Sequence, residues 1–216
     1  MRFITFRYFL LFFSLLILNT QAFAKYAFHA TAFNDISCSN ARLIAYGPFD
    51  YKTAPHDKIQ IVLDYHFTPE RYYSENDINY TLGALPNYHP ALLNMVKVYL
   101  YRASKHRRKQ RLSKTKLRPP ECYLYRALRF RPKDHQTHNL FAYFLYKIKK
   151  YDEAIEYYKK SIKIKKKNAE AYYHLGLILV TLDRFEEARK YAKIAYKQKY
   201  PLKGLKRQLK KAGYPL

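Results

Sequence analysis

Glycine is scarce in this chain, with 5 among 216 residues. This number argues against an all-β sandwich with many tight turns, because such turns favour glycine. It also leaves little material for a loop that could cradle a phosphate. No Gly-x-Ser-x-Gly, Walker A or His-Glu-x-x-His pattern is present. We therefore find no catalytic constellation and expect neither an enzyme nor a cofactor.

Long apolar runs are absent except at the N-terminus, which reads MRFITFRYFLLFFSLLILNTQAFA. Two arginines precede an apolar run over residues 9–18, and Ala22-Phe23-Ala24 supplies a small-x-small cleavage site. The run is shorter than the about 20 apolar residues that a membrane span needs. We predict that residues 1–24 are a cleaved signal peptide and that the mature chain has no transmembrane span. An uncleaved anchor is the alternative.

Cysteine is nearly absent, since the chain has only Cys38 and Cys122. Neither belongs to a Cys-x-x-Cys motif, so a redox or zinc site has no local support. In the oxidising compartment that export implies, a lone pair of cysteines is most simply a disulfide. We predict that disulfide here, with two buried free thiols as the alternative.

Acidic residues are also few, 16 Asp and Glu against 41 Lys and Arg, which gives a net charge of +25. The densest basic stretch, residues 102–118, holds nine Lys and Arg and no acid. Like charges at this density keep a segment exposed. One interpretation is an arm that docks anionic phospholipid, lipopolysaccharide phosphates or an acidic protein through Arg107, Arg108, Lys109 and Arg111. The other is a solvated loop, and we expect no nucleic acid partner for an exported protein.

The C-terminal half contains two related segments. KYDEAIEYYKKSI begins at residue 150 and RFEEARKYAKIAY at residue 184, a spacing of 34. With Ala169 as position 1, large apolar residues fall at positions 4, 7 and 11 and small ones at 8, 20 and 27, and the preceding unit follows the same frame with Ser161 at position 27. This arrangement resembles the tetratricopeptide repeat, which is two antiparallel helices per unit. The small residues lie where the two helices would cross.

The remaining chain is less regular. Residues 68–134 resemble degenerate repeat helices: one beginning at Thr68-Pro69, then HPALLNMVKVYLYR and PECYLYRALRF, separated by a basic insertion at about 103–118. Residues 25–67 form an irregular segment in which KIQIVLDYHF alternates apolar and polar residues over 59–65. That alternation favours a strand, with a degenerate repeat helix as the rival.

The predicted fold is therefore mainly α, a solenoid of tetratricopeptide helical hairpins with this irregular N-terminal segment. Complete repeats span 135–168 and 169–202. Residues 203–216 are the C-terminal capping segment, whose basic helix runs from about 202 to 212 and caps the stack. The motifs GPFDY, HFTPE, DINYTL, LPNYHPALL, ECYLYRALRFRP and YPLKGLKRQLKKAG resemble those of exported bacterial tetratricopeptide proteins. The resemblance covers most of the mature chain and implies a Gram-negative periplasm, but it brings no activity to transfer.

His135 and His138 would share one face of a helix, as metal ligands can. His138 occupies a packing position of the repeat and His135 lies at its boundary, so we expect no metal site. The preferred function is that of an adaptor that binds a protein or peptide in the concave groove lined by first helices. The alternative is a basic protein that binds the envelope surface through its arm. Positions 2, 5, 9, 12 and 13 of each first helix are expected to face the groove. From these we select Leu93, Lys97, Leu100, Tyr101, Asn139, Tyr143, Tyr146, Lys147, Tyr173, Leu177, Val180 and Thr181.

Overall fold

The computed structural model describes residues 48–109 and 117–216, leaving out the side chains of 105–109. These residues form helices and no strand, which confirms the mainly α prediction for this part of the chain. The helices are α3 (His56–His66), α4 (Glu75–Ala84), α5 (His89–Lys109), α6 (Pro120–Phe130), α7 (His135–Lys147), α8 (Tyr151–Ile164), α9 (Ala169–Thr181), α10 (Phe185–Lys197) and α11 (Gly204–Lys211).

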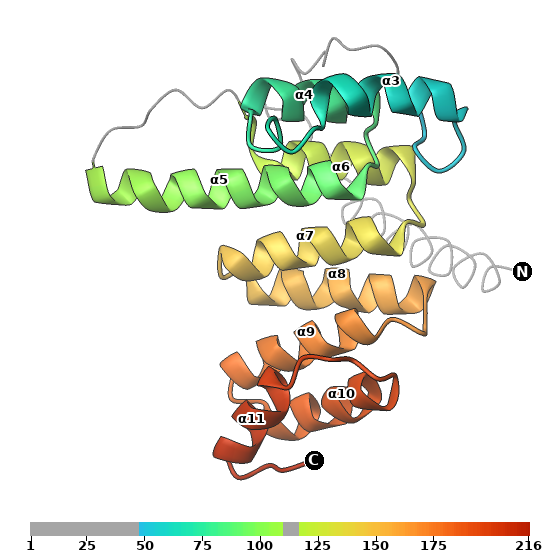
Figure 1. The fold of residues 1–216 in the computed structure, drawn as a ribbon. Coiled ribbons are helices and arrows are strands. Elements are labelled where there is room, and N and C mark those ends of the chain that lie inside the picture. The colour runs from blue at the N-terminus through green and yellow to red at the C-terminus, as the bar shows by residue number, and fades with distance from the viewer. Residues whose placement is uncertain (1–47, 110–116) are drawn as a thin grey trace, which may run out of the picture. The chain divides into compact units, whose positions relative to one another are not determined.

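Helices that follow one another along the chain pack together as hairpins: α3 with α4, α5 with α6, α7 with α8, and α9 with α10 (Figure 1). The first helices α5, α7 and α9 also contact one another in that order. α11 packs against both α9 and α10, as expected of a helix that caps the last repeat. The described residues thus form the predicted helical-hairpin solenoid.

Small residues permit the close approach of helices in the last repeat. Gly176 in α9 and Ala188 in α10 are buried, and a Cβ on Gly176 would lie 3.5 Å from the carbonyl oxygen of Ala188. The same Cβ would lie only 2.5 Å from Cδ2 of Leu205 in α11. The contact with α10 is at an ordinary van der Waals distance, so the docking of α11 is what restricts the size of the residue at position 8.

The turns that end α7, α9 and α10 share one backbone conformation. Lys149, Asp183 and Lys199 each have a positive φ, between 55° and 65°. After the first of these turns, the N–H of Lys150 donates to the carbonyl of Leu145 at 2.9 Å, which is the six-residue closure of a Schellman motif. This closure satisfies a helix-end carbonyl and sends the chain back along the helix it has just left.

The strand expected over 59–65 is wrong, because these residues belong to α3. Of the alternating set, Ile61 is 50% exposed and Tyr65 is 66% exposed, whereas Val62 between them is 1% exposed. Ile59, Val62 and Leu63 face the packed side, with the spacing of three and four that a helix requires. The segment is helical, as the rival interpretation expects, and the irregular N-terminal segment does not extend over residues 56–66.

Two helix boundaries also differ from expectation. α4 begins at Glu75 rather than Pro69, and its N-cap is Ser74, whose hydroxyl accepts the N–H of Asp77. Residues 68–73 instead form turns closed by backbone bonds from Arg71 to Thr68 and from Ser74 to Arg71. α5 continues to Lys109 and so takes up the first part of the predicted insertion. The Arg and Lys residues there favour helix and nothing between 102 and 109 breaks it.

Candidate functional site

We call the predicted groove positions of the first helices α5, α7 and α9 the first-helix face. Its most accessible side chains lie on α5 and α7, where Lys97, Tyr101 and Lys147 are exposed and Tyr146 is half-buried. Tyr101 is 64% exposed, a large fraction for an aromatic side chain. Other predicted groove residues are partly buried on this face: Leu93, Leu100, Tyr143, Leu177 and Val180. Thr181 is exposed at the end of α9 and donates its hydroxyl to its own helix.

An open pocket of about 450 Å³ adjoins this face at α5. It is lined by Tyr73, Lys97, Val98, Tyr101 and Arg102, so the two predicted groove residues Lys97 and Tyr101 do meet a cavity. Arg102 is held in place by an ion pair with Glu75 of α4, at 2.7 Å. Lys97 forms no ion pair among the described residues, so its charge remains available to a ligand.

On α7, the ammonium group of Lys147 lies near two aromatic rings of the first-helix face. Nζ of Lys147 lies 5.4 Å from the ring centre of Tyr143 and 5.9 Å from that of Tyr146. Such contacts attract the ammonium to the face of the ring and also restrain a flexible side chain. Lys147 is therefore a positive charge held beside two aromatic surfaces, and it remains exposed to solvent.

Two predicted groove residues are not available for binding. Asn139 is 5% exposed, because its amide donates to Asn168 at 3.3 Å and to Glu170 at 3.2 Å across the α7–α9 contact. Tyr173 is 4% exposed, and the ring of Tyr200 covers it at a centroid distance of 4.5 Å. The residue at repeat position 5 is therefore packed against neighbouring residues in both α7 and α9. At α9 the first-helix face is covered by the segment that follows α10.

A histidine lies beneath the face, within an aromatic cluster. The ring of His174 stacks on that of Tyr158 at 5.9 Å and meets the edge of Tyr143 at 6.5 Å. Burial, reinforced by the positive charge of Lys147, lowers the pKa of His174 to about 4. The imidazole is consequently neutral near pH 7, and the positive charge at this part of the face comes from Lys147.

A polar network fastens the segment before α3 to the solenoid. The carboxylate of Asp134 is buried and accepts a hydrogen bond from the hydroxyl of Thr137 at 2.9 Å. Nε2 of His89 lies 2.6 Å from this carboxylate, and Nζ of Lys52 forms an ion pair with it at 3.4 Å. Burial alone would raise the pKa of Asp134, but these hydrogen bonds and charges outweigh burial and hold it well below its usual range. These groups stabilise the fold rather than form a ligand-binding site, because they are already bonded to one another.

A second part of the network lies next to it. Asp50 accepts the guanidinium of Arg131 at 2.5 Å and the amide of Asn87 at 2.8 Å. Asn87 in turn accepts the backbone N–H of Tyr51 at 3.1 Å. The network thus joins residues of the GPFDY and LPNYHPALL motifs to the segment between α6 and α7.

The remaining candidates lie partly outside the described residues. Arg107, Arg108 and Lys109 are at the end of α5 without described side chains, and Arg111 lies outside, so docking by the basic arm stays a prediction. Residues 1–24 and Cys38 also lie outside, while Cys122 is 6% exposed in α6. The disulfide and the signal peptide therefore stay predictions as well.

The described residues include both His135 and His138, whose contacts are with neighbouring backbone and side-chain groups. His138 is buried and its Nε2 lies 3.0 Å from the carbonyl oxygen of Pro132, while the carbonyl of His135 accepts the hydroxyl of Ser161. Within residues 48–109 and 117–216, no cluster of three His, Cys, Asp or Glu side chains could hold a metal ion. In the same ranges, no helix has the length and apolar character needed to cross a membrane.

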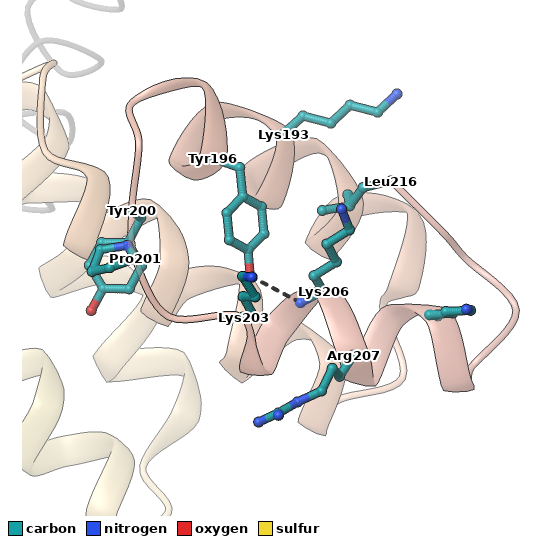
Figure 2. A pocket seen from close by; sticks show the side chains of 9 residues that line it. Lys193, Tyr196, Tyr200, Pro201, Lys203, Lys206, Arg207 and Leu216 are labelled. Carbon is teal, nitrogen blue, oxygen red and sulfur yellow. Dashed lines mark hydrogen bonds between the residues drawn. The ribbon is translucent and has the colours of Figure 1, made fainter.

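Sequence reasoning missed a second cavity at the C-terminal end, an open pocket of about 680 Å³ between α10 and α11 (Figure 2). The segment YPLKGLKRQLKK provides much of its lining, and its density of Lys and Arg was a visible signal. That segment was interpreted only as a cap. The lining comprises Lys193, Tyr196, Tyr200, Pro201, Lys203, Lys206, Arg207, Lys210 and Leu216.

Comparison with known protein families identifies the repeats. One tetratricopeptide repeat model matches residues 142–183 and a second matches residues 169–198. No curated protein matches the chain. With the helical hairpins described above, these matches show that this is a tetratricopeptide repeat protein. Repeats of this class generally act as non-enzymatic scaffolds for protein–protein interaction, and the chain has the architecture for that role.

Proposed function

We propose that the protein is an adaptor that binds a partner protein through the first-helix face, at Lys97 and Tyr101 of α5 and at Tyr143, Tyr146 and Lys147 of α7. The partner segment carries an apolar or aromatic residue that enters the pocket beside Tyr101. It also carries one or two carboxylates, which meet the ammonium groups of Lys97 and Lys147. The proposed place of action is the periplasm, because the N-terminal 24 residues have the pattern of an export signal.

The observation that carries the proposal is the exposure of Tyr101 beside a pocket of about 450 Å³. At 64% exposed, Tyr101 leaves most of its side chain accessible to a partner. Tyrosine is among the residue types in which binding energy concentrates at protein interfaces, since it buries a large area at a low cost in conformational entropy. The pocket offers an aromatic wall, and the cations beside it select for a partner with negative charge.

The cations on this face favour an acidic partner for a further reason. Lys147 is held over two rings, so little side-chain entropy is lost when it meets a carboxylate. Lys97 faces the pocket without a competing acid of its own. Complementary charge of this kind speeds association and rejects partners of the wrong sign.

Site-specific photocrosslinking in living cells tests the proposal. A photoreactive phenylalanine analogue replaces Tyr101, and in a control strain it replaces Lys159, which is exposed on the second helix α8. We expect one discrete protein adduct from position 101 that is absent from position 159. Identical adducts at both positions, or no protein adduct at position 101, would contradict the proposal.

A further inference from the structure

The C-terminal helix has two distinct sides. Leu205 and Leu209 of α11 are fully buried against α9 and α10, four residues apart as one face of a helix requires. Lys206, Arg207 and Lys210 lie on the other side and are exposed. Docking of the apolar side therefore directs three cations away from the core, and all three line the pocket between α10 and α11.

The apolar wall of this pocket is fixed by hydrogen bonds. The hydroxyl of Tyr196 donates to the carbonyl of Leu202 at 3.0 Å. It also accepts the N–H of Lys206 at 3.1 Å, which ties α10 to the start of α11 (Figure 2). Tyr200 is held by its contact with the buried Tyr173, and Pro201 follows it along the same wall. The wall is thus preformed in the free protein, which reduces the entropy lost when a ligand binds.

The charged side chains around the pocket are all of one sign. Five cationic side chains line it and no acidic side chain does: Lys193, Lys203, Lys206, Arg207 and Lys210. Among the described residues none of these five forms an ion pair with a carboxylate, whereas Arg102, Arg131 and Arg184 elsewhere each do. Like charges gathered at one concave surface repel one another and focus a positive potential there. A bound anion would relieve that repulsion.

We propose that this pocket binds a ligand about the size of a sugar ring that carries two or more phosphate groups. Its volume of about 680 Å³ suits a small molecule or a lipid headgroup rather than an extended chain. Lysine binds phosphate as a point charge and arginine binds it with two parallel hydrogen bonds, and both are present. The rings of Tyr196 and Tyr200 and the side chain of Pro201 provide an apolar wall for the body of the ligand.

The first test measures binding of fructose 1,6-bisphosphate to the full-length protein by isothermal titration calorimetry. The pocket variant is Arg207→Gln with Lys210→Gln, and the matched control is Lys163→Gln with Lys167→Gln, which removes the same charge from exposed positions on and after α8. We expect saturable binding that weakens at least tenfold in the pocket variant and less than twofold in the control. Circular dichroism and urea unfolding show whether each variant is folded.

The second test separates a free ligand from a lipid headgroup. Vesicles that contain a phosphatidylinositol bisphosphate are compared with phosphatidylglycerol vesicles of equal charge density. Preference for the bisphosphate vesicles, lost in the pocket variant, supports a headgroup, and binding of the soluble bisphosphate alone supports a free ligand. The proposal is overturned if neither bisphosphate binds, if both variants lose affinity equally, or if a polyglutamate peptide binds this pocket as tightly as the bisphosphates do.

Discussion

Nε2 of His89, the first residue of α5, lies 2.6 Å from a carboxylate oxygen of Asp134, the N-cap of α7. The contact joins two first helices at their N-terminal ends across 45 positions of the chain. Lys52 reaches the other oxygen of the same carboxylate from the segment before α3. Asp134 therefore holds together three parts of the solenoid, and it does so as a buried charge with several partners.

Replacing Asp134 with alanine should destabilise the protein by roughly 2–4 kcal/mol, because it removes a helix cap and leaves His89 and Thr137 without their shared acceptor. Urea unfolding at pH 7 measures the change. Asp152→Ala on the exposed first turn of α8 is the control and should have a much smaller effect. Equal losses for the two variants would show that the network adds nothing beyond the effect of an acid in the first turn of a helix.

His174 should make stability depend on pH below about 6.5. Its pKa in the folded protein is about 4, so between pH 6.5 and 4 the unfolded chain binds a proton that the folded protein does not. Stability is therefore lost as the pH falls through this window, by at most about 2 kcal/mol between pH 7 and pH 5. Urea unfolding of the parent and of His174→Gln at both values gives the comparison.

The slope between pH 7 and pH 5 should be smaller in His174→Gln than in the parent. Some slope should remain, because burial also lowers the pKa of His138 and of His135. An unchanged slope would mean that His174 titrates as an exposed histidine does.

Gly176 should resist enlargement because of the helix docked against it. Gly176→Leu should cost roughly 1–3 kcal/mol, since even a Cβ there would meet the side chain of Leu205 at 2.5 Å. In a Leu205→Ala background, Gly176→Ala should be tolerated, because the obstructing atoms are gone. A melting temperature unchanged by Gly176→Leu would contradict the packing of α11 on α9.

Cys38 and Cys122 should be joined in the exported protein, where the bond would stabilise the fold by about 4 kcal/mol in the chain-entropy model. Alkylation without reductant, followed by intact-mass measurement, should find neither thiol modified. Two alkylated cysteines in material purified from its native compartment would contradict the pairing.

The two complete repeats could be predicted because their signal is local and repeats with a fixed period. Small residues such as Gly176 and Ala188 and the large residues around them define the frame without knowledge of any distant contact. α3 could not be predicted in the same way. Its residues 59, 61, 63 and 65 fit an alternating pattern, and only the packing against α4 shows that Ile61 and Tyr65 face solvent.

The first-helix face was predicted in part, for a related reason. The repeat frame predicts which positions share a face, and of these Lys97, Tyr101 and Lys147 are exposed in the structure. The repeat frame does not show which other residues of the chain cover that face. Tyr173 is covered by Tyr200, which lies beyond the end of the repeat. The pocket between α10 and α11 was missed because the docking direction of α11 depends on the same tertiary contacts.

The central claim, binding through the first-helix face, is tested most directly by the affinity of the crosslinked partner for purified protein. The face variant is Tyr101→Ala with Lys147→Ala. The control is Ile164→Ala with Lys159→Ala, which removes one apolar side chain and one cation from α8. We predict that the Kd rises at least tenfold for the face variant, equivalent to about 1.4 kcal/mol, and stays within twofold for the control. An unchanged Kd for a folded face variant would contradict the account and place the partner elsewhere on the protein.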